Sequence, residues 1–141
     1  MRTRVRRFAH VLERIGLAMA GAACGLFVSA HVGSSISFLT TQGFLLFMMI
    51  AGAFGFYLGI DTPPLPFHAD VDPNGPTAGI DSAEFLSSVG TFLATLTAFI
   101  SVGIIVLRFE PDIGWTVLIG IGWTAGIAMQ IVAGAIARAR A

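Results

Sequence analysis

Residues 85–107 read FLSSVGTFLATLTAFISVGIIVL, and no charged residue occurs between Glu84 and Arg108. An α-helix rises about 1.5 Å per residue, so about 20 apolar residues cross a hydrocarbon core about 30 Å thick. The stretch therefore predicts one transmembrane helix over residues 83–107.

Charged residues are scarce in the rest of the chain as well. Of its 141 residues, 55% are hydrophobic and 11% are charged, whereas roughly 25% charged residues is usual in soluble proteins. No charge occurs between Asp112 and Arg138, which predicts a further span over residues 113–137.

The longest uncharged stretch lies between Arg14 and Asp61 and is too long for a single membrane helix. Glycine and hydroxyl residues interrupt it at 33–35 and again at 40–43. These interruptions divide the stretch into two predicted spans joined by a turn, residues 15–32 and 44–60.

The four stretches together predict an all-α membrane protein, a bundle of four transmembrane helices. A chain of 141 residues is one domain by length, so we expect a single integral membrane domain over 1–141. A polar loop, residues 61–82, joins the second span to the third.

Arginines gather at the two ends of the chain. They occur before the first span and after the last, at Arg2, Arg4, Arg6, Arg7, Arg14, Arg138 and Arg140. Basic residues near membrane ends stay on the cytoplasmic side, and an even number of spans permits both ends to do so. We therefore expect cytoplasmic termini in a bacterial inner (plasma) membrane, with Arg108 on the opposite side.

The basic segment 1–14 has the pattern of an amphipathic helix. Val5, Phe8 and Leu12 fall on one helical face, as in helices that lie in the membrane interface. We expect Arg2, Arg4, Arg6 and Arg7 to contact anionic lipid at the membrane surface. The alternative is a cleaved signal peptide, because a basic start and an apolar run precede small residues at 28–30.

Glycine pairs spaced four residues apart occur in three of the predicted spans. They are Gly21 and Gly25, Gly55 and Gly59, and Gly122 and Gly126. Small residues at this spacing let helix backbones approach closely in a membrane. The pairs predict packing within the bundle or, alternatively, a face that binds another subunit.

The third span also carries a stripe of hydroxyl side chains. Its members are Ser87, Thr91, Thr95 and Ser101, and together with Ala94 and Ala98 they form a series of small residues that recur every three or four positions. Such hydroxyls usually bond to their own helix and form a packing face. A water-lined or ion-lined path is the alternative interpretation.

Polar side chains that could carry chemistry inside the membrane are few. Only His31 and Gln130 come close to being groups of this kind. His31 falls at the end of the first span, at the expected headgroup level. Haem held by two histidines needs a second one within the bundle, but His10 and His68 lie outside the predicted spans. Motifs of hydrolases, proteases, nucleotidases and thiol oxidoreductases are missing from the sequence, so we predict neither an enzyme nor a bound cofactor.

The predicted loop contains one pattern typical of a metal site. Oxygen-bearing side chains occupy the first, third, fifth and twelfth positions of residues 70–81, at Asp70, Asp72, Asn74 and Asp81. This spacing resembles an EF-hand-type calcium loop. A proline-rich stretch at 62–66 precedes it in place of a helix, and the same residue types fill ordinary turns. Calcium binding is therefore the less favoured interpretation.

Abundant packing motifs without catalytic motifs favour a small accessory or scaffolding subunit of a larger membrane complex. The alternative is a homo-oligomeric channel or carrier lined by the hydroxyl stripe of the third span. The expected partners are the lipid bilayer and other membrane subunits or further copies of the chain. A formal net charge of zero gives no reason to expect nucleic acid.

Overall fold

The computed structural model describes residues 2–59 and 82–140. In these ranges the chain forms α1 (Arg2–Ser35), the short 3₁₀ helix η1 (Ser37–Leu39), α2 (Gln42–Gly59), α3 (Ser82–Leu107) and α4 (Ile113–Arg140), and no strand. Within these described ranges, four helices are long and apolar enough to cross a membrane. The predicted fold class, an all-α membrane protein with a four-helix bundle, is confirmed.

The first helix is longer than the sequence suggested. It begins at Arg2 and continues to Ser35 without a break, so the segment 1–14 is not a separate helix. Neither proline nor a run of turn residues interrupts this region, which explains why the helix continues into the first span. The part long and apolar enough to span a membrane is Val11–Ser35.

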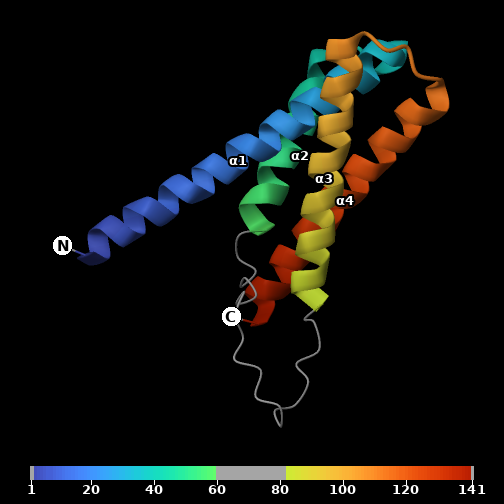
Figure 1. Cartoon of the computed structure of the whole chain (residues 1–141). Coiled ribbons are helices and arrows are strands. Elements are labelled where there is room, and N and C mark those ends of the chain that lie inside the picture. The colour runs from blue at the N-terminus through green and yellow to red at the C-terminus, as the bar shows by residue number, and fades with distance from the viewer. Residues whose placement is uncertain (1, 60–81, 141) are drawn as a thin grey trace.

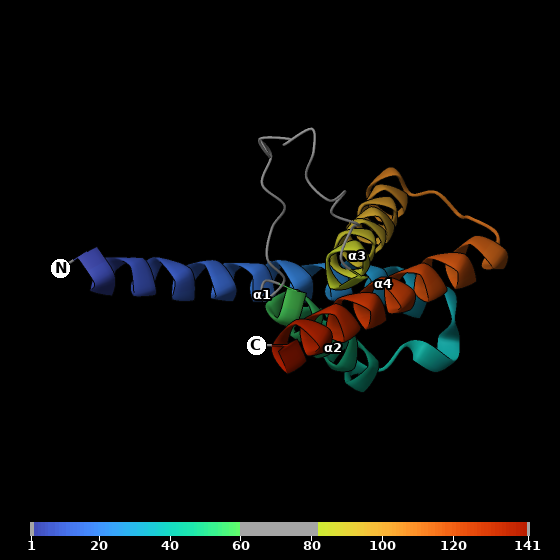
Figure 2. The same cartoon turned by 90° about the horizontal axis from the view of Figure 1, so that it is seen from below.

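The four helices run alternately up and down (Figure 1). The α1–α2 turn and the α3–α4 turn lie at one end of the bundle, here called the hairpin end and defined by residues 36–41 and 108–112. The C-terminus lies at the opposite end, the terminal end. Seen along the other direction, the N-terminal part of α1 extends away from the remaining helices (Figure 2).

Glycines bring α1 and α2 into backbone contact. A methyl carbon added to Gly21 would collide with the carbonyl oxygen of Gly52, and one added to Gly25 would collide with that of Met48. In lipid, such close approach supplies much of the contact energy between helices, because the hydrophobic effect no longer drives them together. The first predicted glycine pair therefore lies inside the chain's own bundle.

The other predicted pairs divide between tight contact and ordinary van der Waals contact. A carbon added to Gly126 would lie 2.8 Å from the backbone of Ala94, and one added to Gly122 would lie 3.0 Å from Thr97 Cγ2. Gly55 faces Ile127 and Gln130 of α4 at 3.1 Å, whereas the nearest atom to a carbon on Gly59 is Ser87 Oγ at 3.7 Å. Five of the six glycines thus pack tightly against neighbouring helices, and Gly59 does not.

The apolar core is narrow, and the outer surface is apolar as well. Buried side chains line the helix contacts at Val28, Val32, Met48, Phe56, Ile119, Trp123 and Ile127. Large apolar residues also face outwards, with Phe99 78% and Phe47 67% exposed. A surface of this kind is suited to contact with lipid tails rather than water.

Replacing Gly21 with alanine should weaken the bundle. The added carbon meets the backbone of Gly52, so α1 and α2 must separate, and overpacking of this kind costs about 1–3 kcal/mol. Reversible unfolding in mixed micelles should show this loss for Gly21→Ala. Gly16→Ala is the matched control on the same helix, because nothing lies within 4 Å of its added carbon. Equal effects of the two substitutions would contradict the backbone contact.

Candidate functional site

The α3–α4 turn has an unusual backbone conformation at Arg108. The amide of Arg108 donates to Ile105 O at 3.3 Å and that of Phe109 to Ile104 O at 3.1 Å, the bond pattern of a Schellman helix end. The residue in the left-handed conformation of this motif is usually glycine, but here it is Arg108 with φ of 53°. Asp112 then caps the start of α4, because its Oδ2 accepts a hydrogen bond from the amide of Gly114 at 3.1 Å.

A pocket of about 580 Å³ opens beside this turn at the hairpin end. The end of α1, the end of α3 with the turn, and the start of α4 all contribute to it. Its polar lining consists of His31, Ser34, Ser35, Arg108, Glu110 and Thr116. Its apolar lining consists of Ile104, Ile105, Phe109, Pro111 and Ile113.

The pocket has a buried polar floor. His31 is only 2% exposed and Thr116 is fully buried, and Thr116 Oγ1 lies 3.4 Å from His31 Nε2. The hydroxyls of Ser34 and Ser35 donate to the carbonyl oxygen of His31 at 2.8 Å and 3.0 Å. His31 is therefore packed inside the bundle near the end of its span, a placement that its position in the sequence did not show.

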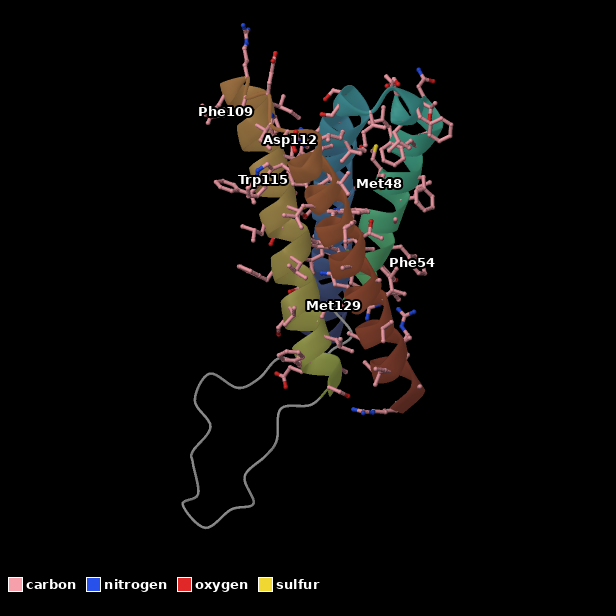
Figure 3. The ribbon with its side chains drawn as sticks, turned by 90° about the vertical axis from the view of Figure 1, so that its right-hand side faces the viewer. Met48, Phe54, Phe109, Asp112, Trp115 and Met129 are labelled. Atoms are coloured by element: carbon pink, nitrogen blue, oxygen red, sulfur yellow. The ribbon has the colours of Figure 1, made fainter. Side chains whose placement is uncertain are left out.

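Opposite charges lie at the mouth of the pocket. Arg108 and Glu110 both line it and both are exposed. A smaller cavity of about 330 Å³ adjoins it, lined in part by Glu110, Asp112 and Trp115. Phe109, Asp112 and Trp115 lie close together at the α3–α4 turn in Figure 3.

The hydroxyl stripe predicted on α3 does not form one continuous surface. Thr95 is exposed, whereas Ser101 is fully buried and donates to Thr97 O at 2.8 Å. Thr91 donates to Ser87 O at 2.7 Å, and Thr95 donates to Thr91 O at 2.8 Å. The hydroxyls of Thr91, Thr95 and Ser101 thus bond to their own helix, as is usual for such residues in membrane helices.

A buried glutamine connects α4 to this stripe. Gln130 is 1% exposed, and its Nε2 donates to Thr91 Oγ1 at 2.8 Å. Its Oε1 and the Nε1 of Trp123 have no hydrogen-bond partner within the described part of the chain. Polar groups that are buried in this way inside a membrane bundle are costly and often functional.

Other predicted site residues are not brought together. The calcium ligands Asp70, Asp72, Asn74 and Asp81 lie outside the described residues, as do the side chains of Arg2, Arg4, Arg6 and Arg7. Residues 2–59 and 82–140 contain no cluster of three or more His, Cys, Asp or Glu residues that could hold a metal ion. Side chains from more than one helix do come together at the hairpin-end pocket and in the buried network around Gln130.

Comparison with known proteins gives no relative for this arrangement. The chain matches no protein-family model, no curated protein and no solved structure. A functional interpretation therefore depends on the geometry of the chain itself.

Thr91 and Thr95 should respond differently to removal of their hydroxyls. Thr91→Val leaves the buried Nε2 of Gln130 without an acceptor, which we expect to cost about 1–2 kcal/mol. Thr95→Val removes an exposed hydroxyl that bonds only to its own helix, so unfolding in mixed micelles should change little. Similar losses for both variants would mean that the Gln130 bond contributes no stability.

Proposed function

We propose that the protein is a small membrane protein that binds a zwitterionic molecule in the hairpin-end pocket. The observation that carries this proposal is the lining of the pocket, which combines a guanidinium and a carboxylate at its mouth with a buried His31–Thr116 floor. A volume of about 580 Å³ falls in the range of about 300–1,000 Å³ found for ligand pockets.

The charges at the mouth indicate the chemistry of the ligand. The planar guanidinium of Arg108 suits a phosphate or carboxylate group, which it can bind with two hydrogen bonds. The carboxylate of Glu110 accepts hydrogen bonds from an ammonium group. The ligand therefore carries an anionic and an ammonium group, as do O-phosphoethanolamine and the headgroup of phosphatidylethanolamine.

The side of the membrane follows from the arginines at the chain ends. With the termini in the cytoplasm, the hairpin end and its pocket face the extracytoplasmic side. We propose binding rather than catalysis, because the hydroxyl beside His31 belongs to Thr116, which is fully buried.

Binding should raise the free energy of unfolding of the detergent-solubilised protein by RT ln(1 + [L]/Kd). The unfolding temperature should therefore rise with ligand concentration. We expect O-phosphoethanolamine or micelles containing phosphatidylethanolamine to stabilise the wild-type chain, and inorganic phosphate or ethanolamine alone to stabilise it less. A response to the soluble compound identifies a free ligand, and a response to the micelles alone identifies a lipid.

Arg108→Gly is the sharpest test of this site. Glycine adopts the left-handed conformation of residue 108 without steric cost, so the turn should persist while the guanidinium is lost. We expect at least a tenfold rise in Kd for Arg108→Gly and for Glu110→Gln. Unchanged affinity in both variants, or no response of the wild-type chain to either probe, would refute the proposal.

A second candidate function, an accessory subunit, is favoured by the N-terminal part of α1. In this part of the helix Arg14 contacts Tyr57, with Nη1 3.5 Å from the hydroxyl and the guanidinium carbon 5.4 Å from the ring centroid. Beyond it, Phe8, Val11 and Leu12 are more than half exposed. Because most of the predicted glycines pack inside the bundle, this part of α1 is the better surface for a partner subunit.

A photo-crosslinking amino acid at Leu12 should therefore capture one defined membrane protein in native membranes at near-stoichiometric yield. The same group at Phe47, which is 67% exposed on α2, serves as the lipid-facing control. Capture of a second copy of the chain would favour a homo-oligomer. Crosslinks to lipid alone at both positions would argue against an accessory subunit.

A further inference from the structure

The buried face of α4 carries polar side chains at intervals of seven residues. Thr116, Trp123 and Gln130 are 0%, 2% and 1% exposed. Seven residues are about two helical turns, so the three side chains lie on one face of the helix. Thr116 contacts the pocket floor, and the other two each carry a polar atom without a partner among the described residues.

The hydrogen bonds around Gln130 fix the orientation of its amide. Thr91 uses its only hydroxyl proton in the bond to Ser87 O at 2.7 Å, so its oxygen can only accept from Gln130. The group that faces Thr91 must then be the NH₂ group. The amide oxygen is therefore the atom that points towards α2, where a carbon added to Gly55 would lie 3.1 Å from it.

The indole ring of Trp123 contacts the same side of α2. A carbon added to Gly52 would lie 3.3 Å from Trp123 Cζ2, which belongs to the edge of the ring next to Nε1. Gly52 and Gly55 are about 4.5 Å apart along the helix axis. A donor that cannot accept and an acceptor that cannot donate thus both lie beside one glycine-lined stretch of α2.

The two unpartnered atoms are complementary in their chemistry. An unsatisfied polar group costs about 1–3 kcal/mol when buried in a protein and more inside a membrane. One molecule that accepts from the indole N–H and donates to the amide oxygen removes both costs. Neither Gly52 nor Gly55 places a side chain beside these atoms, and the backbone of Gly21 and the methyl groups of Ile127 approach the same stretch of α2.

We propose that the α2–α4 contact contains an internal site for a small uncharged hydrogen-bonding molecule, with water as its resident, between Trp123 Nε1 and Gln130 Oε1. The residues that hold the site lie about two and four turns of α4 away from Thr116 in the pocket floor, and the site does not depend on a ligand in the pocket. The α2–α4 contact inside the bundle is then hydrated rather than a dry apolar contact.

Trp123 itself can report on this site. The chain has two tryptophans, so Trp115→Phe leaves a single indole N–H, and Trp115 is 60% exposed, which makes its replacement mild. In ¹⁵N-labelled protein in micelles, we expect the indole proton of Trp123 to show an exchange or Overhauser peak to long-lived water. A missing peak, together with the chemical shift of an indole without a hydrogen bond, would overturn the proposal.

A glycine substitution then locates the water. In the Trp115→Phe background, Gly55→Ala places a carbon 3.1 Å from the amide oxygen and should abolish the peak. Gly59→Ala, one turn further along α2, meets its nearest atom at 3.7 Å and should leave the peak unchanged. A peak that survives Gly55→Ala places the water elsewhere and refutes the site. If Gly55→Ala does not fold, the water peak of Trp123 in the Trp115→Phe protein alone still decides whether the proposal holds.

Discussion

Close contact between helix backbones is the constraint on which the rest of the structure depends. Inside a bilayer every backbone polar group must be satisfied within a helix, and the helices gain little from the hydrophobic effect when they associate. The helices must therefore gain contact energy by packing closely. Gly21 and Gly52 bring α1 and α2 into backbone contact, and Gly90 and Gly126 do the same for α3 and α4. This close packing also confines the polar side chains of α4 to fixed positions between the helices.

The hairpin end departs from this regular packing. Arg108 occupies a left-handed position that favours glycine and costs other residues about 1–2 kcal/mol. Strain of this size tends to persist where a site requires the side chain. The guanidinium that it retains lies at the mouth of a pocket whose floor is His31 and Thr116. The backbone conformation and the pocket thus support the same interpretation of this end of the molecule.

Much of the fold could be predicted from the sequence, but the sites could not. Three gaps between charged residues, the longest of them divided by glycine and hydroxyl residues, located the four spans, because the membrane imposes a minimum length on each helix. The sequence predicted a helical pattern over 1–14 but did not show that it continues into the first span, because amphipathic periodicity does not show whether a helix ends at an interface or continues through it. The contact between His31 and Thr116 joins residues 85 positions apart, and no local pattern predicts it. The spacing of Thr116, Trp123 and Gln130 was a usable signal, since each is seven positions after the one before it.

The glycine motif on α2 shows why such patterns are ambiguous in a sequence. Gly55 and Gly59 are spaced like any helix-packing pair, yet only Gly55 lies in tight contact with a neighbouring helix. What faces Gly55 is a polar atom, the buried amide oxygen of Gln130, as well as the methyl groups of Ile127. The sequence shows the same residue, glycine, whether its role is to permit apolar packing or to leave room for a hydrogen-bonded molecule. The side chain on the opposing helix decides between them, and at Gly55 that side chain is a glutamine whose other amide atom is already bonded.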